Sequence, residues 1–285
     1  MFPKAQGSPA VMTPTLSPTL SPTLSPEYLS RFGGIARLYG KEALQALSHA
    51  HFAVIGLGGV GTWAAEAMAR SGVGELTLIE LDDVCITNTN RQIHTLQSTI
   101  GQPKNQVMSE RLLAINPELK LHTHHDFLTK THVESYIGNQ HHVVVDAMDS
   151  VHVKAALAAY CTRNKIRLIT CGSSGGKLDP SRITCGDLGS TKSDPLLSKM
   201  RNLLYHSHNF TKTNNRRFRI DAIYSEEQMV YPKPDGSVCS RKQFLDDGVK
   251  LDCSAGVGSS VMVTGGFGFA AAKRAIDRHL KKSAE

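Results

Sequence analysis

The sequence predicts an α/β protein with a Rossmann-like, mostly parallel sheet and helices on both faces, extended by antiparallel strands and a C-terminal helix. Residues 53–62 read AVIGLGGVGT, an apolar run that ends in glycines and passes into an Ala-rich helical pattern. This is a strand, a tight turn and a helix start, where amide N–H groups can bind a phosphate. From residue 52 to about 171, strand and helix patterns then alternate. Alone, the glycine spacing indicates a dinucleotide or ATP.

The alternating pattern predicts each element in turn. Before it, Ser25-Pro26-Glu27 predicts a helix start that continues through Phe32 and is broken at Gly33-Gly34, with a further helix at 41–49. Strands are expected at 52–55, 73–81, 120–124, 143–147 and 167–171, and helices at 61–71, 103–116, 131–137 and 151–164. After residue 171 we expect antiparallel-type strands at 182–187 and 218–224.

Composition divides the chain into a tail and one domain. Residues 13–26 read TPTLSPTLSPTLSP, and prolines at every fourth residue exclude a helix, so 1–25 is expected to be a disordered tail. Residues 26–285 are expected to form one nucleotide-binding domain. It carries a basic insert at 189–219 and a long loop at 225–252, the kind of segment that often binds ligands.

Bulk properties exclude several classes. The six cysteines form no C-x-x-C pair, which argues against a structural zinc site, and together with the nucleotide loop they favour the reducing cytoplasm. The N-terminus lacks the layout of a signal peptide. Residues 254–272 are apolar but rich in Gly, Ser and Thr, which favours a buried, closely packed helix over a membrane span. A net charge of +7 fits a polyanionic partner without requiring one.

Polar residues follow the predicted strands at their carboxyl ends. Glu80 closes the second strand about 20 residues after the glycines, where a carboxylate accepts hydrogen bonds from a ribose. An N-cap or a surface carboxylate is the alternative. The segment 84–92 is polar, rich in Asn, and has the period of neither a helix nor a strand.

Together these residues resemble the ATP-binding domain of the ubiquitin-activating, ThiF and MoeB superfamily. The match covers about residues 30–190 and consists of Gly56-Leu-Gly-Gly-Val-Gly61, Glu80-Leu-Asp82, Asn88-Thr-Asn-Arg91-Gln92, Lys104 and Val145-Asp-Ala-Met-Asp149-Ser150. More specific stretches are similar to its branch of tRNA threonylcarbamoyladenosine dehydratases (TcdA): residues 31–40, 82–94, 231–232 and 252–258.

The resemblance implies an enzyme that activates a carboxylate on ATP. Arg91 and Lys104 would bind the phosphates, Asp149 would hold Mg²⁺, and Asn88 would orient a phosphate or the ribose. Glu80 would bind the ribose, although the family usually has Asp there. The implied ATP-binding set is Gly56, Gly58, Gly59, Gly61, Glu80, Asp82, Asn88, Arg91, Lys104, Asp149 and Ser150.

The substrate implied by the resemblance is threonylcarbamoyladenosine beside the tRNA anticodon. Its activated carboxylate is attacked by a nitrogen of its own carbamoyl group, so a ring closes and water is lost overall. The loop residue Cys239 is either a catalytic thiol, which could form a thioester or receive sulfur from a cysteine-desulfurase acceptor protein, or an unreactive one. Cys171 and Cys253 are expected to be packing residues.

The resemblance also implies a homodimer, because an N-terminal arginine of this family reaches the neighbouring subunit's ATP site. Arg31 and Arg37 are the two candidates, and the sequence does not choose between them. It further suggests a monovalent cation, Na⁺ or K⁺, near residues 252–258.

The basic insert is the predicted tRNA contact. Its cations Lys212, Arg216, Arg217 and Arg219 are interleaved with Phe210 and Phe218, which could stack on bases. A solvated charged loop is the alternative. The histidines at 122, 124, 125, 141 and 142 are expected to be surface residues rather than metal ligands.

Three other functions fit parts of the pattern. An adenylyltransferase or sulfurtransferase for a small ubiquitin-like sulfur carrier would share the ATP site, but such enzymes often carry a zinc module. An NAD-dependent oxidoreductase would explain the glycines and Glu80, yet it gives no reason for Arg91, Lys104 and Asp149 together. A non-catalytic tRNA- or partner-binding scaffold is disfavoured by the same intact polar set.

Overall fold

The computed structural model of the chain describes residues 24–211, 217–233, 235–240 and 257–283. Most of the expected tail, Lys212, Arg216 and residues 241–256 therefore lie outside the described residues. The helices are α1 (Pro26–Tyr39), α2 (Lys41–Ser48), α3 (Gly61–Arg70), α4 (Lys104–Ile115), α5 (Val133–Tyr136), α6 (Val151–Arg163), α7 (Pro195–Ser207) and α8 (Val261–Ser283). The strands are β1 (His51–Ile55), β2 (Glu75–Ile79), β3 (Lys120–His124), β4 (Val143–Asp146), β5 (Arg167–Cys171), β6 (Ile183–Asp187), β7 (Asp221–Ser225), β8 (Tyr231–Pro232) and β9 (Val238–Cys239).

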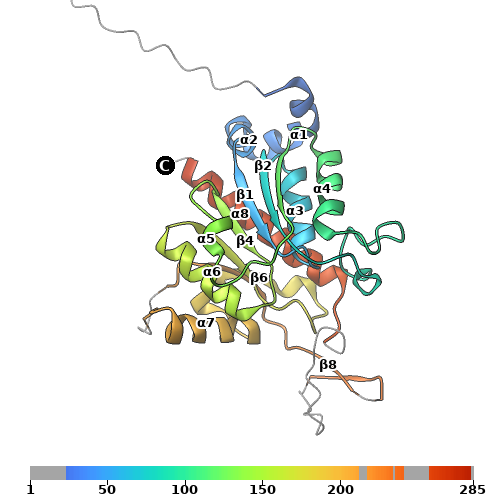
Figure 1. Cartoon of the computed structure of the whole chain (residues 1–285), viewed down its shortest axis with the longest axis vertical. Coiled ribbons are helices and arrows are strands. Elements are labelled where there is room, and N and C mark those ends of the chain that lie inside the picture. Colours follow the sequence, from blue (N-terminus) through green and yellow to red (C-terminus); the bar gives the residue numbers. More distant parts are fainter. Residues whose placement is uncertain (1–23, 212–216, 234, 241–256, 284–285) are drawn as a thin grey trace, which may run out of the picture.

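The main sheet has the order β3-β2-β1-β4-β5-β7-β6, and its neighbours are parallel except for the antiparallel pair β6 and β7. The chain runs outward from β1 through β2 to β3 and then returns to place β4 on the other side of β1 (Figure 1). The predicted Rossmann-like class is confirmed. The reversal between β1 and β4 opens a crevice at their carboxyl ends, where such folds bind ligands.

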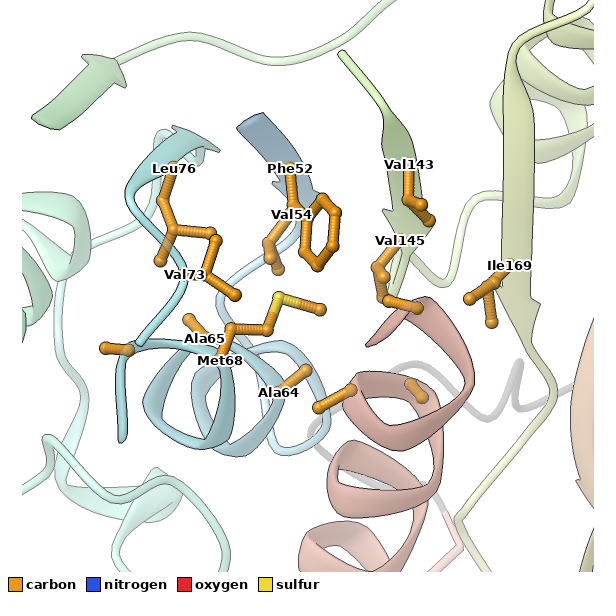
Figure 2. Close-up of a cluster of buried hydrophobic side chains, with 14 of the residues drawn as sticks. Phe52, Val54, Ala64, Ala65, Met68, Val73, Leu76, Val143, Val145 and Ile169 are labelled. Atoms are coloured by element: carbon orange, nitrogen blue, oxygen red, sulfur yellow. The ribbon is translucent and has the colours of Figure 1, made fainter. Parts of the chain in front are cut away.

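Helices cover both faces of the sheet because β1 alternates its apolar side chains between them. Phe52 and Val54 point toward α3 and α8, where they pack in one cluster with Met68 of α3 (Figure 2). Ala53 and Ile55 face the opposite layer, which α5, α6 and α7 build. All these side chains are buried, and burying each large one contributes roughly 1.5–3 kcal/mol.

The long helix α8 packs closely on α3 through small residues, as the sequence predicts. A methyl group added at Gly268 would lie 2.6 Å from the Val60 carbonyl oxygen and 2.7 Å from Trp63 Cβ, so only glycine allows this approach. At the other end of the helix, Arg274 and Arg278 bind the Asp221 carboxylate of β7. Among the described helices, none is long and apolar enough to cross a membrane.

The predicted break at Gly33-Gly34 is wrong, because α1 continues without interruption to Tyr39. The predicted start is confirmed: the Ser25 hydroxyl accepts a hydrogen bond from Tyr28 N, with Pro26 in the first turn. The buried face of α1, which includes Phe32, packs on Leu44 of α2. That packing outweighs the cost of about 1 kcal/mol that each glycine adds inside a helix.

The basic insert is also not an open loop, because α7 occupies its centre. Asp194 caps the helix by accepting from Leu197 N at 2.9 Å, and Leu197, Met200 and Leu204 bury one face. Both signals of this helix can be read from the sequence: the Asp194-Pro195 start, and apolar residues spaced three and four positions apart. The strand expected at 218–224 is shifted to β7, which pairs antiparallel to β6 but parallel to β5.

Candidate active site

The glycine loop between β1 and α3 is shaped by its lack of side chains. Gly56 has a φ of 87°, and a Cβ at Gly61 would lie 1.8 Å from the Gly56 carbonyl oxygen. A Cβ at Gly56 would lie 3.1 Å from the Ala147 carbonyl oxygen, so the loop lies directly against the end of β4. A Cβ at Gly58 would meet nothing within 4 Å. Gly58 is thus the position of the loop that is open to a ligand.

Glu80 fastens this loop to the end of β2. Its Oε2 accepts from Leu57 N at 2.7 Å, and its Oε1 accepts from Leu81 N and Asp82 N at 3.0 Å each. A carboxylate offers about four acceptor sites. Three are engaged here, so Glu80 retains about one for a ribose hydroxyl. Its first role is therefore to shape the loop, a role that the sequence did not predict.

Arg91 lies over the glycine loop. A Cβ at Gly59 would lie 3.2 Å from Arg91 Cγ, and Trp63 Nε1 donates to the Arg91 carbonyl oxygen at 3.0 Å. Its Nη1 donates to Thr87 O and to Asn90 Oδ1, at 2.9 Å in each case. These contacts fix a guanidinium next to the glycines, as an anion-binding role requires.

Lys104 is held at the start of α4 rather than extended into solvent. Its side chain is 6% exposed, and its Nζ donates to Asp82 Oδ2 at 2.9 Å. Asp82 itself is 54% exposed. A phosphate bound here would share the ammonium group with Asp82, so Asp82 positions Lys104.

Asn88 is a structural residue of its segment. It ends the 3-10 turn Ile86–Asn88 and is buried, and its Oδ1 accepts from Cys85 N at 3.3 Å. That bond closes the polar segment 84–92, for which the sequence showed no regular period. Only the Nδ2 donors of Asn88 can serve a phosphate or a ribose.

Asp149 and Ser150 are exposed at the carboxyl end of β4, where α6 begins. They follow Ala147, which contacts the glycine loop, so the crevice between β1 and β4 brings Asp149 to the same end of the sheet as Arg91. An exposed carboxylate beside a phosphate-binding loop has the donor chemistry that Mg²⁺ prefers.

A buried ion pair supports the loop that carries Asp149. Lys154 Nζ lies 2.9 Å from Asp146 Oδ2, both side chains are 0% exposed, and the same ammonium donates to Met148 O at 3.0 Å. Thr170 Oγ1 donates to Asp146 Oδ2 at 2.7 Å. In the sequence Lys154 is one charge in an Ala-rich helix, and nothing there marks it as buried.

Two adjoining cavities extend from Asp149 toward α7. The first, about 260 Å³, is lined by Asp149, Ser173, Lys199 and Met229 among others. The second, about 580 Å³, shares Pro195 and Met229 with it, and its wall includes Lys192, Arg201, Tyr231 and Ser240. The hairpin of β8 and β9 thus borders the second cavity. Ser240 lines this cavity, whereas the neighbouring Cys239 does not. The helix α7, which the sequence analysis did not predict, lines both cavities.

Arg31 and Arg37 are both exposed on α1. Tyr28 of that helix hydrogen-bonds to the Gly72 carbonyl before β2, so α1 lies at the amino end of the parallel strands (Figure 1). The glycine loop follows the carboxyl end of β1. Both arginines are therefore at the opposite end of the sheet from the ATP loop of their own chain.

Arg217 and Arg219 are exposed beside β7, and Arg219 N donates to Asp187 Oδ2 at 2.8 Å. The suggestion that Phe218 stacks on bases is wrong. Phe218 is buried, and its ring stacks on Phe210 at 5.7 Å. Phe210 is partly buried in the same cluster.

Two of the cysteine expectations can be compared with the structure. Cys171 is buried as expected, and burial raises its pKa to about 12. Cys253 lies outside the described residues. Cys85, which the sequence did not single out, is exposed, and a hydrogen bond with Thr87 lowers its pKa, helped by Lys104 and Arg91.

Comparison with known proteins places this fold and site in one family. The ThiF family matches residues 33–277, and the chain belongs to that family. Within it, the chain is 47% identical to the tRNA threonylcarbamoyladenosine dehydratase of Escherichia coli K12 over 89% of this chain and 95% of the relative. The enzyme of the same name from Haemophilus influenzae is 46% identical over 90% and 95%.

Solved structures agree with the sequence relatives. The crystal structure of E. coli TcdA in complex with ATP matches with a TM-score of 0.82 at 44% identity, covering 92% of this chain and 98% of that one. The molybdopterin-synthase adenylyltransferase of Salmonella typhimurium is 36% identical, but over only 48% of this chain and 54% of its own. The similarity to the sister class is thus confined to part of the chain.

Proposed function

We propose that this protein is an ATP-dependent tRNA threonylcarbamoyladenosine dehydratase that cyclises the modified nucleoside next to the anticodon. One observation supports the proposal: the glycine loop, Arg91 and Asp149 lie at the same end of the sheet, in a chain that aligns with dehydratases of that name over nearly its whole length. We infer that residues 26–285 act as a single ATP-binding unit.

The chemistry follows from the groups at the crevice. A carboxylate oxygen of the substrate attacks the α-phosphorus of ATP and pyrophosphate leaves. A carbamoyl nitrogen then attacks the activated carbonyl carbon, loses its proton, and AMP leaves as the ring closes. Because ring closure is intramolecular, it needs no enzyme nucleophile. Negative charge builds on phosphate oxygens, so fixed cations and amide donors are the required catalysts.

Each site residue has one task in this scheme. Arg91 binds phosphate oxygens above Gly59, and Lys104, oriented by Asp82, neutralises the charge that develops on them. Glu80 uses its remaining acceptor site for the ribose. Asp149 would hold Mg²⁺, which supplies charge neutralisation on the phosphates.

The substrate side fits a nucleoside in a polyanion. The two cavities next to Asp149 together have room for a modified adenosine, and their walls carry Lys192, Lys199 and Arg201. We infer that tRNA contacts the protein at these cavities. Arg217 and Arg219 precede β7 at the amino end of the parallel strands, so we infer that they bind tRNA phosphates away from the cavities, with Lys212 and Arg216 of the same insert.

Further features of the family extend the proposal. We infer a homodimer in which Arg31 or Arg37 reaches the partner's ATP site, since both lie away from the ATP loop of their own chain. We also infer a monovalent cation near residues 252–258, a sulfur-acceptor protein that binds at Cys239, and a cytoplasmic location. The reduced thiols Cys85, Cys161, Cys171 and Cys185 fit a reducing compartment.

Mass spectrometry of tRNA nucleosides tests the reaction. Substrate tRNA carrying threonylcarbamoyladenosine is incubated with the protein, ATP and Mg²⁺, and the expected product is lighter by one water. Omitting ATP and replacing it with NAD are the controls. An unchanged nucleoside, together with ATP–pyrophosphate exchange that a small sulfur-carrier protein stimulates, would instead establish the sister adenylyltransferase. Calorimetry that detects NAD binding and no ATP binding would support the oxidoreductase.

A further inference from the structure

A cluster of imidazoles lies at the amino end of the sheet, away from the glycine loop. His51 is the first residue of β1, Glu75 is the first residue of β2, and His122 lies in β3. The three strands are neighbours, with His51 paired to Glu75 and Thr77 paired to His122. The proposed reaction uses none of these residues, because its groups lie at the carboxyl ends of the strands.

The three side chains have the spacing of a metal site. In the described part of the chain they form the one group of three or more His, Cys, Asp and Glu residues whose ligand atoms all lie within 4.8 Å of one another. His51 Nδ1 lies 3.4 Å and His122 Nε2 lies 2.7 Å from Glu75 Oε1. Zinc bonds of 2.0–2.1 Å require a ligand-to-ligand edge of about 3.3 Å. The first pair already has this edge, and the second needs to open by about 0.6 Å.

The surroundings of His51 fit a ligand that is held in one orientation. Its second ring nitrogen, Nε2, lies 2.8 Å from the Thr77 hydroxyl, which is buried. His141 Nε2 approaches the same hydroxyl at 3.2 Å. Metal-bound histidines characteristically use their other ring nitrogen in such a hydrogen bond, which fixes both the ring and its tautomer. The expectation that His141 is a surface residue is wrong, because it is 4% exposed.

An ion can reach this cluster from solvent. The side chain of His122 is 52% exposed, whereas that of His51 is 10% exposed, so the cluster opens to solvent at one side. A neutral imidazole and a carboxylate are the ligating forms.

We propose that His51 Nδ1, Glu75 and His122 Nε2 bind one divalent transition-metal ion of the Zn²⁺ type, with water in the fourth position. The ligating form of His51 is the neutral tautomer with a bare Nδ1, and its single ring proton, on Nε2, donates to the Thr77 hydroxyl. The ion links β1, β2 and β3 at the amino end of the sheet, away from the proposed active site. Its role is to stabilise the fold, and it is independent of the proposed dehydratase reaction.

Calorimetric titration of the full-length, chelator-stripped protein with ZnCl₂, without ATP, tests the site. One equivalent is expected to bind and to raise the melting temperature. His122→Ala, at an exposed position, and Glu75→Gln are each expected to weaken this binding more than about 100-fold, and Thr77→Val about 10- to 100-fold. Dehydratase activity of His122→Ala should equal that of the parent protein.

His124→Ala is the matched control, because His124 lies on the same strand and packs on Tyr136 instead of joining the cluster. It should leave zinc affinity unchanged. The proposal is overturned if the parent protein binds no zinc, if His124→Ala weakens binding as much as His122→Ala, or if the Co²⁺-loaded protein shows a thiolate charge-transfer band. A nitrogen and oxygen site gives d–d bands without that transition.

Discussion

The two loops that meet at the β1–β4 crevice are held in different ways. The glycine loop is shaped by missing side chains and by backbone hydrogen bonds, with the Glu80 carboxylate bound to three amides. The loop that carries Asp149 is held from below by Lys154 and Asp146, both fully buried. The first arrangement relies on one carboxylate at the end of β2 that binds backbone amides, whereas the second relies on a charged side-chain pair between β4 and α6 with a hydroxyl from the neighbouring strand β5. The difference shows that two halves of one site can have unequal tolerance to substitution.

Asp149→Ala separates the function of the second loop from its support. We expect turnover to fall at least about 1,000-fold, on the order of 4 kcal/mol, because the phosphates lose their metal-binding carboxylate. The melting temperature should stay within a degree or two, since Asp149 is exposed. Turnover is measured by the nucleoside assay, with Glu134→Ala, another exposed carboxylate, as the control. Normal activity of the Asp149 variant would contradict the assignment.

Lys154→Met removes the support itself. It leaves Asp146 buried without its cation, and we expect the free energy of unfolding to fall by about 3–5 kcal/mol in urea titrations. Lys199→Met, at an exposed lysine of α7, should change it by less than about 0.5 kcal/mol. Combining Lys154→Met with Asp146→Leu should restore part of the loss. A Lys154 variant as stable as the parent protein would show that the pair does not hold this loop.

Substitution of two glycines of the first loop should affect stability differently, although both should weaken ATP binding. Gly58→Ala fits the fold, since its Cβ meets nothing within 4 Å, and should leave the melting temperature unchanged while weakening ATP binding about tenfold, or 1.4 kcal/mol. Gly61→Ala places a Cβ 1.8 Å from a carbonyl oxygen and should lower both stability and ATP affinity. Calorimetry with ATP and thermal unfolding measure the two effects. If Gly58→Ala binds ATP normally, the ligand does not approach that position.

The smallest expected effect is a difference in reactivity between two cysteines, one in the segment that carries Arg91 and one in α6. Hydrogen bonding to Thr87, with the charges of Lys104 and Arg91, lowers the pKa of exposed Cys85, whereas burial raises that of Cys161 to about 12. Since the thiolate is the form that reacts, Cys85 should be alkylated by iodoacetamide at neutral pH and Cys161 should not. Mass spectrometry of peptides across a pH series measures both. Equal rates for the two thiols in the folded protein would contradict this contrast.

Much of the fold was predictable from local patterns. The strands β3 and β5 have the predicted bounds, and the helix at 151–164 differs by one residue, because strong periodicity and flanking polar residues mark them. The errors occur where packing overrides propensity. Glycines in α1 did not stop the helix because its apolar face is buried, and the basic residues around α7 obscured a capped amphipathic helix.

The candidate site divides in the same way. The nucleotide loop, the carboxylate after β4 and the family resemblance were predictable from the sequence alone, because those groups stand at fixed spacings from strand ends. Only the tertiary structure revealed that Lys154 is buried beneath that carboxylate, that Glu80 holds the loop, and that His51, Glu75 and His122 meet. These arrangements join side chains from different strands, helices and loops, and burial and partner choice arise only when the folded sheet brings such residues side by side.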